Sequence, residues 1–331
     1  MRILVTIPEG PVKETFIPPQ VAESIRDMGE ATWNETCVQF SPKELRDKLV
    51  NTEVCITGWG CPRLDESILE NASDLKLVAH TGGTVAPIVS DYLYNKGIKV
   101  ISGNQIYAES VAEGVLAYML SSLRDIPYFN SEVQNGRWKA EKYHNEGLLD
   151  QSVGLVGFGM VAKFLVELLR PFRVKIKAYG KPADEAAMYE YGVEKASLEE
   201  IFSSCRIISL HVPKKPDTYH MIDKRLLEMI SEGSLLVNTA RGSVIDEAAM
   251  EDELQKGRFK AALDVFETEP LPPESKLRNL QNVILIPHMA GPTIDRRKYV
   301  TLGLIRDIKQ YNKGERLAYE ISREYAAFMT E

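Results

Sequence analysis

The sequence of 331 residues has few cysteines and no long apolar run, and both shortages exclude classes of protein. Its four cysteines, Cys37, Cys55, Cys61 and Cys205, form no Cys-x-x-Cys pair, which is typical of reduced cytosolic thiols rather than of a disulfide framework. No segment approaches the roughly 20 apolar residues of a membrane span, and the apolar start of "MRILVTIPEG" is too short for a signal peptide. We therefore expect a cytoplasmic protein that does not bind a membrane.

The sequence also lacks an excess of positive charge. Lysine and arginine total 40 against 47 aspartates and glutamates, for a formal net charge of -7. This balance repels nucleic acid and anionic lipid, so we expect neither as a partner. It does not exclude a small anionic substrate, because such a site needs only local positive charge.

What the sequence does contain is an alternation of short β-branched runs with helical patterns, which predicts parallel sheets with crossover helices. The alternation occurs in two series. We expect a substrate domain from residues 1–102 and 293–331, and a dinucleotide-binding domain from residues 103–292. The long helical segments that begin near residues 107 and 293 are expected to act as hinges. The predicted fold class is α/β, with two doubly wound parallel-sheet domains.

A glycine-rich turn marks the predicted cofactor site. In "VGLVGFGMVAKFLVELLR", Gly157, Gly159 and Ala162 fill the G-x-G-x-x-[GA] pattern between a strand and a helix. Gly157 permits the tight turn, and Gly159 leaves room for a pyrophosphate. The amides near Met160 and Val161, at the positive end of the helix dipole, would face the phosphates.

The next strand, "VKIKAYGKPADE", ends in Gly180 and Lys181 where an acid often binds the 2′-hydroxyl of NAD. The lysine removes the repulsion of a 2′-phosphate and offers a counter-charge, so the sequence favours NADP over NAD. One alternative is that Lys181 is a solvated loop residue and that Asp184 or Glu185 turns back toward the ribose.

Three later strand ends carry groups suited to hydride-transfer chemistry: Arg241, Glu269 and His288. A histidine can exchange a proton near neutral pH, a carboxylate can orient it, and an arginine can clamp a substrate carboxylate. Glu267 and Asp264 are also near, so the residues alone leave the choice of carboxylate open. No metal ligands are expected.

Several segments together resemble the D-isomer-specific 2-hydroxyacid dehydrogenase family, which includes glyoxylate and hydroxypyruvate reductases, D-lactate dehydrogenases and phosphoglycerate dehydrogenases. They are "ESVAEGVLAYML", the glycine turn, "SLHVPKKPDTYHMID", "LLVNTARGSVIDEAAM", "ALDVFETEPLP" and "VILIPHMAGPT". The resemblance runs from about residue 75 to 312. It implies a Rossmann cofactor domain, a flavodoxin-like substrate domain and a homodimer.

The resemblance also implies residue roles. Arg241 would bind the substrate carboxylate and carbonyl, Glu269 would pair with His288 as the acid/base, and Asp264 would hold the nicotinamide carboxamide. Further cofactor contacts are implied around His211, Val212, Pro213, Thr239 and Ala240.

The loop "AHTGGTVAP" departs from the family pattern, because it lacks the Asp-Asn pair common after the glycines. We still expect the amides of Thr81, Gly82 and Gly83 to bind the substrate carboxylate. Trp59 is either a wall of the substrate pocket or a surface-loop aromatic, and His80 is expected to be structural.

The resulting hypothesis is an NAD(P)-dependent oxidoreductase that interconverts a small 2-keto acid and a D-2-hydroxy acid, without specifying which acid. One alternative is a cofactor-sensing binding protein without turnover. Another is a related dehydrogenase for formate or phosphite.

Overall fold

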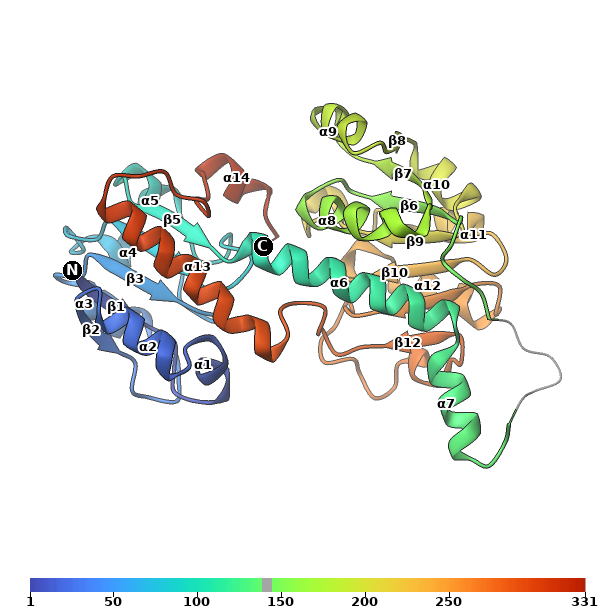
Figure 1. Cartoon of the computed structure of the whole chain (residues 1–331), viewed down its shortest axis with the longest axis horizontal. Helices are drawn as coiled ribbons and strands as arrows, with labels where there is room; N and C mark the ends of the chain where they lie inside the picture. The colour runs from blue at the N-terminus through green and yellow to red at the C-terminus, as the bar shows by residue number, and fades with distance from the viewer. Residues whose placement is uncertain (139–144, 331) are drawn as a thin grey trace. The chain divides into compact units, whose positions relative to one another are not determined.

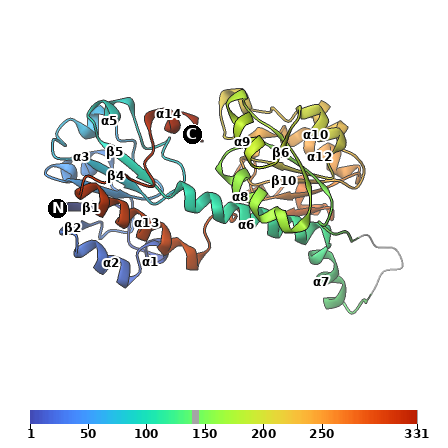
Figure 2. The same ribbon diagram turned by 45° about the horizontal axis from the view of Figure 1, so that its top comes forward.

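The computed structural model describes residues 1–138 and 145–330, which form two units, each built on one parallel sheet (Figures 1 and 2). Unit 1 comprises Met1–Tyr107 and Pro292–Glu331, and unit 2 comprises Ala108–Gly291. The first crossing of the chain lies inside α6 (Asn104–Leu123), rather than before it as the sequence predicted. Ile106 and Tyr107 pack in the core of unit 1, whereas Ala112 and the later buried residues of α6 belong to the core of unit 2.

The sheet of unit 1 has the strand order β2-β1-β3-β4-β5, the order of flavodoxin-like folds. Its strands are β1 (Arg2–Val5), β2 (Glu30–Trp33), β3 (Val54–Thr57), β4 (Leu77–His80) and β5 (Lys99–Ser102). Its helices are α1 (Pro11–Phe16), α2 (Pro19–Arg26), α3 (Pro42–Leu49), α4 (Glu66–Leu69), α5 (Asp91–Asn95), α13 (Ile294–Asn312) and α14 (Arg323–Phe328).

Helices cover both faces of this sheet. Strands β3 and β4 are buried along their whole length, as expected of parallel strands with two covered faces. One cluster joins alternate strand residues to α1, α2 and α13, and the other joins the intervening residues to α3, α4 and α5. The period-2 alternation of side chains therefore divides each strand between two cores.

The sheet of unit 2 has the order β12-β11-β10-β9-β6-β7-β8, and all of its strand pairs are parallel. Its strands are β6 (Ser152–Val156), β7 (Lys175–Tyr179), β8 (Glu194–Lys195), β9 (Ile207–Leu210), β10 (Leu235–Asn238), β11 (Lys260–Leu263) and β12 (Val283–Leu285). Its helices are most of α6, α7 (Ile126–Gln134), α8 (Met160–Leu169), α9 (Glu185–Glu190), α10 (Leu198–Ser204), α11 (Lys224–Met229) and α12 (Glu247–Gln255).

This order is that of a Rossmann sheet with one added strand, because β7 and β8 extend from β6 on one side while β9 to β12 extend on the other. The predicted fold class, two doubly wound parallel-sheet domains, is confirmed. In such a sheet the reversal of strand order, here between β6 and β9, leaves a crevice at the carboxyl ends of the strands.

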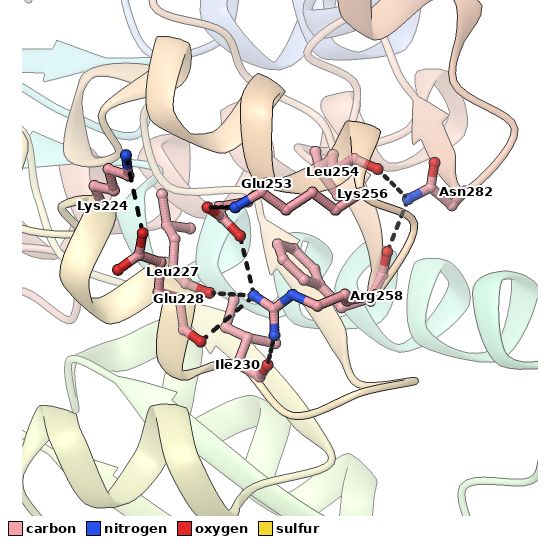
Figure 3. A network of polar contacts seen from close by, with 10 residues as sticks. Lys224, Leu227, Glu228, Ile230, Glu253, Leu254, Lys256, Arg258 and Asn282 are labelled. Carbon is pink, nitrogen blue, oxygen red and sulfur yellow. Dashed lines mark hydrogen bonds and ion pairs between the residues drawn. The ribbon is translucent and has the colours of Figure 1, made fainter.

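A polar network ties α11, α12 and the start of β11 together in unit 2 (Figure 3). Glu253, 1% exposed, accepts hydrogen bonds from Lys256 and Arg258. Arg258 also donates to the Ile230 carbonyl at 2.9 Å, and Asn282 donates to the Phe259 carbonyl at 2.8 Å. The network satisfies a buried carboxylate and the open carbonyls of a helix end, and so fixes the start of the strand that leads to Asp264.

Across the described ranges, no helix is both long enough and apolar enough to cross a membrane.

Candidate active site

The predicted cofactor and catalytic residues of unit 2 all follow strands of one parallel sheet, so they gather at its carboxyl edge. The turn after β6 carries the glycines, the turn after β9 carries His211 to Pro213, and the turn after β10 carries Thr239 to Arg241. Asp264 follows β11, and His288 follows β12. Glu269 lies in the loop that follows β11.

The glycine turn lies between β6 and α8. Gly157 has φ 99°, its amide donates to the Tyr179 carbonyl, and a Cβ there would lie 2.8 Å from the His211 carbonyl oxygen. Gly157 is therefore required both by backbone conformation and by close approach. A Cβ on Gly159 would meet nothing within 4 Å, and no side chain caps the start of α8 at Met160. The open space and the uncapped amides of Met160 and Val161 fit a pyrophosphate.

The two acidic residues after β7, Asp184 and Glu185, both have partners within the protein. The Asp184 carboxylate accepts the Lys181 amide at 2.9 Å, and a Cβ on Gly180 would lie 2.9 Å from that same carboxylate. Glu185 forms an ion pair with Lys195. Both acids that could have turned toward a ribose therefore have partners within the turn and the neighbouring strand.

Two buried polar atoms on neighbouring strand ends have no hydrogen-bond partner among the described residues: His211 Nε2 and Thr239 Oγ1. Burial lowers the pKa of His211 to about 4, so its imidazole is neutral at physiological pH. Buried polar atoms without partners are rare in folded proteins. Their place beside the glycine turn, together with the open space at Gly159, fits a bound dinucleotide.

The turn that carries Arg241 packs directly on the loop that carries Glu269. A Cβ on Gly242 would lie 1.8 Å from the Phe266 carbonyl carbon, so only glycine permits this approach. Asn238 braces the turn, donating to the Arg241 carbonyl at 3.1 Å. Burial lowers the pKa of the Arg241 guanidinium, and the nearby charge of Glu269 opposes this effect. The Arg241 guanidinium donates to the Ala240 carbonyl at 2.5 Å, within the same turn.

Glu269 pairs with His288. Its Oε2 lies 2.7 Å from His288 Nδ1, and its Oε1 accepts the Phe266 amide at 3.1 Å. The carboxylate therefore orients the imidazole through Nδ1 and leaves Nε2 to exchange a proton. The His288 side chain is 50% exposed, and its backbone has φ 53°, an uncommon left-handed conformation for a histidine.

Asp264 holds the turn that carries His288. It is 1% exposed, and its carboxylate accepts the amides of Met289 at 2.7 Å and Ala290 at 3.0 Å, while its carbonyl accepts the His288 amide at 2.9 Å. Burial raises the pKa of the Asp264 carboxyl, and the two amides oppose this effect. The Tyr118 hydroxyl of α6 also donates to it at 3.4 Å. A nicotinamide carboxamide bound here would share a carboxylate that already positions the catalytic turn.

The sequence analysis missed Tyr118, Asn238 and Gly242. The sequence could have indicated Gly242, because this glycine directly follows Arg241 in "NTARGS". No sequence pattern indicates Tyr118, since its contact with Asp264 joins positions 146 residues apart.

A second histidine–glutamate pair lies in the same unit. His220 Nε2 is 2.9 Å from Glu267 Oε1, which also accepts the Tyr219 hydroxyl at 3.2 Å. The two acids that the sequence could not distinguish, Glu267 and Glu269, therefore serve different histidines.

The predicted substrate residues belong to unit 1, at the carboxyl edge of its own sheet. The Thr81 amide donates to the Thr57 carbonyl at 2.9 Å, so it is not open to a ligand as expected, because the ladder between β3 and β4 continues one residue further. No hydrogen bond within residues 1–138 and 145–330 occupies the amides of Gly82 and Gly83. Trp59 is 48% exposed and stacks edge-on against Phe16 with 5.4 Å between ring centroids.

His80 lies beneath these glycines and is 3% exposed. Its Nδ1 is 2.9 Å from the Thr57 hydroxyl, and its Nε2 would lie 2.3 Å from a Cβ on Gly82. Burial lowers the pKa of His80 to about 4. The histidine is a neutral support of the loop, as the sequence predicted, with a threonine hydroxyl as its partner instead of the backbone.

No cluster of three or more histidine, cysteine or acidic side chains within the described ranges is arranged to hold a metal ion.

Residues 116–290 match the family model described as "D-isomer specific 2-hydroxyacid dehydrogenase, NAD binding domain". The chain therefore belongs to the D-isomer specific 2-hydroxyacid dehydrogenase family. It is 33% identical over 249 residues to a hydroxypyruvate reductase from Thermotoga maritima, which covers 74% of this chain and 80% of the relative.

It is also 29% identical over 306 residues to a D-3-phosphoglycerate dehydrogenase from Methanocaldococcus jannaschii, covering 92% of this chain and 58% of the relative. The chain spans about half the length of the phosphoglycerate dehydrogenases that it matches. Among solved structures, it resembles an acyclic imino acid reductase in complex with NADPH and D-Arg, with a TM-score of 0.81, 23% identity, and 97% and 100% of the two chains covered. At 23% sequence identity, this structural similarity supports the fold alone.

Proposed function

We propose that the protein is an NAD(P)-dependent oxidoreductase that interconverts a 2-keto acid and a D-2-hydroxy acid. The observation that carries this proposal is the imidazole of His288 held by the Glu269 carboxylate, at the carboxyl edge of the sheet that also carries Arg241, in the family's NAD-binding domain. A relative that covers most of this chain bears the name of a hydroxypyruvate reductase, and another that of a glyoxylate reductase. We assign cofactor binding to unit 2 and substrate binding to the carboxyl edge of the sheet of unit 1.

A nicotinamide cofactor, when bound, would supply the hydride for the substrate C2 in one direction and would accept it in the other. His288 gives a proton from Nε2 to the oxygen on C2 in the reducing direction, and takes it back in the oxidising direction. Glu269 stabilises the imidazolium and holds its ring in place through Nδ1. Arg241 offers two parallel N–H groups to the substrate carboxylate and polarises the carbonyl. In unit 1, the amides of Gly82 and Gly83 are the donors proposed for a substrate carboxylate.

The cofactor residues in this proposal are the glycine turn with Met160 and Val161, the strand-end groups from His211 to Pro213, Thr239 with Ala240, and Asp264. NADP is preferred to NAD, because Asp184 and Glu185 have local partners and the exposed Lys181 follows the strand end where the 2′-phosphate is expected.

The variant Lys181→Asp tests the cofactor preference. Replacing the positive side chain with a carboxylate should shift the ratio of kcat/KM for NADPH to that for NADH toward NADH by at least about tenfold, since a charge-assisted hydrogen bond contributes about 1.5–3 kcal/mol. Lys175→Asp, at the exposed amino end of β7 and away from its carboxyl end, is a control for general effects of charge. An unchanged ratio in Lys181→Asp would contradict the preference for NADP.

The activity itself is tested with a panel of 2-keto acids (glyoxylate, pyruvate, hydroxypyruvate and longer acids), each with NADH and NADPH, by following the absorbance of the reduced nicotinamide. We expect oxidation of the cofactor with at least one acid and formation of the D-hydroxy product. Cofactor binding without turnover on any acid would instead support a cofactor-sensing binding protein. The Glu269–His288 pair argues against that alternative, because sensing needs no proton donor.

We further propose a homodimer formed through unit 2. None of the nine residues of α7 is buried, and Ile126 and Val133 are 54% and 51% exposed on a helix of apolar character (Figure 1). A second copy of this chain is the occupant that the family resemblance implies. Sedimentation equilibrium should give twice the mass of the chain, and Val133→Asp should shift it toward the monomer. A monomeric native protein at micromolar concentration would contradict this proposal.

A further inference from the structure

A cavity of about 350 Å³ opens at the carboxyl edge of the sheet of unit 1. It lies among the segments that follow β1, β2, β3 and β4, which is where ligands bind in open α/β sheets. Most of its wall is apolar, formed by Ile7, Pro8, Pro11, Val12, Phe16 and Trp59. Its volume lies at the lower end of the range of small-molecule pockets.

The walls of the cavity are held in place by bonds between its segments. The Glu9 amide donates to the Thr36 carbonyl at 2.8 Å, and the Gln39 side chain donates to the Trp59 carbonyl at 2.5 Å. The Arg297 guanidinium of α13 lies 5.5 Å from the ring centroids of both Phe16 and Trp59. The cavity is thus preformed within unit 1, and Trp59 is one of its walls.

The charged groups near the cavity already have protein partners. Glu9 is the one charged residue among those that line it, and it forms an ion pair with Lys13. Arg297 donates to the Thr15 hydroxyl and to the Pro292 carbonyl, both at 3.3 Å. No lysine or arginine is among the residues that line the cavity, so an anionic ligand group would be desolvated between its walls without a counter-charge.

We propose that this cavity takes the side chain of the substrate and selects 2-keto acids with a large apolar side chain, branched aliphatic or aromatic. The inference rests on the proposed function, which places the substrate carboxylate at the amides of Gly82 and Gly83. Thr81, the residue directly before them, lines the cavity, so a substrate anchored at the glycines has its side chain beside Trp59 and Val12. Glyoxylate has no side chain to fill the cavity, and a phosphorylated side chain would place its charge against apolar walls.

Comparison of substrates gives the first test. With the preferred cofactor, kcat/KM for phenylpyruvate and for 4-methyl-2-oxopentanoate should exceed that for glyoxylate and hydroxypyruvate by at least about tenfold, because burial of even one further methylene changes this ratio by about tenfold or more. Equal or better efficiency with glyoxylate or hydroxypyruvate would overturn the proposal.

A pair of matched valine variants gives the second test. Val12 lines the cavity and is 45% exposed, whereas Val50, at the end of α3, is 46% exposed and does not line it. Val12→Asp should lower kcat/KM for phenylpyruvate at least about tenfold relative to that for glyoxylate, mainly through KM, because it puts a carboxylate in an apolar wall. Val50→Asp should leave the ratio of the two substrates unchanged. A ratio unaltered by Val12→Asp would contradict the proposal.

Binding can be measured without turnover, because Cys37 lines the cavity and is exposed while the other three cysteines are buried. We expect 2-hydroxy-3-phenylpropanoate to slow the alkylation of Cys37 by iodoacetamide, followed by mass spectrometry, several-fold more than glycolate does at the same concentration. Equal protection by the two acids would overturn the proposal whatever the turnover. Selective protection in a protein that reduces no keto acid would contradict the proposed function and still support this cavity as a binding site for apolar side chains.

Discussion

The two units place a histidine at the same kind of position, the carboxyl end of a parallel strand, in opposite chemical environments. His80 of unit 1 is 3% exposed, contacts the neutral hydroxyl of Thr57, and has its pKa lowered to about 4 by burial. His288 of unit 2 has a side chain that is 50% exposed and is held by the Glu269 carboxylate at 2.7 Å. The first imidazole cannot take up a proton at physiological pH without a cost, whereas the second is open to solvent and contacts a carboxylate.

The comparison teaches that the location of a histidine does not define its role. The partner and the burial decide whether it supports a loop or exchanges a proton. The two histidines also differ in backbone conformation. His288 is left-handed, with φ 53°, while His80 continues the regular strand β4. Uncommon backbone conformations concentrate at functional sites, since surrounding structure must hold them.

The largest effect that tests this comparison is expected for His288→Asn. Asparagine cannot act as a proton donor, so kcat should fall by about 10²–10⁴-fold, the usual contribution of general acid–base catalysis. The affinity for the reduced cofactor, measured by its fluorescence, should change little.

The second histidine–glutamate pair provides the matched control for that variant. His220 also has a carboxylate partner and a left-handed backbone with φ 48°, so His220→Asn makes the same replacement at a similar pair in the same unit. It should retain most of the activity. If His220→Asn lost as much activity as His288→Asn, the assignment of the proton donor to His288 would not stand.

A smaller effect is expected for Arg241→Lys. Lysine keeps the charge and loses the planar fork that binds a carboxylate with two parallel bonds. We expect kcat/KM to fall by about 10–100-fold, since hydrogen bonds to charged groups contribute about 1.5–3 kcal/mol. Steady-state kinetics at saturating cofactor would measure this fall in kcat/KM. Wild-type kcat/KM in this variant would rule out a carboxylate clamp at Arg241.

The smallest expected effect is a change of the free energy of unfolding with pH. The unfolded chain binds a proton at His80 below about pH 6.5, while the folded state resists it down to a pKa of about 4. The unfolded state therefore holds more protons between these values, and the free energy of unfolding should fall as pH decreases, by up to about 1.4 kcal/mol per pH unit. Urea unfolding at pH 7, 5.5 and 4.5 would measure the slope.

The variant His80→Gln should flatten that slope, because glutamine does not titrate. His211→Gln removes a second histidine whose pKa burial lowers to about 4, and should flatten the slope by a similar amount through unit 2. A slope in His80→Gln as steep as in the native protein would show that His80 is not buried in its neutral form.

Much of the fold followed from the sequence because it depends on local periodicity. Runs such as "VCIT" and "LVAH" alternate with helical patterns, and each became a buried parallel strand followed by a helix. The glycine turn was equally accessible, since Gly157 and Gly159 lie between the strand and the helix that they join. The boundary that the sequence analysis places between residues 102 and 103 has no such local signal, because α6 continues without a break from one core into the other.

The candidate site could be predicted only in part. The residue types at the strand ends suggested proton transfer and carboxylate binding, but Glu267 and Glu269 are two positions apart and chemically identical. Their partners, His220 and His288, come from loops that follow β9 and β12, so only the folded sheet shows which acid meets which histidine. The hydrogen bond between the Thr81 amide and the Thr57 carbonyl could not be predicted either, because it also joins two strands of the folded sheet.

The sequence by itself determined the two-domain α/β architecture, the glycine turn and the kinds of side chain at the strand ends, because periodicity and turn chemistry act over a few residues. The tertiary structure alone decided that Asp264 and Tyr118 hold the turn of His288, that Gly242 lets the turn of Arg241 lie against the Glu269 loop, and that four strand ends enclose an apolar cavity at Trp59. Those features depend on burial and on contacts between distant parts of the chain, and both arise only when parallel strands bring their ends together.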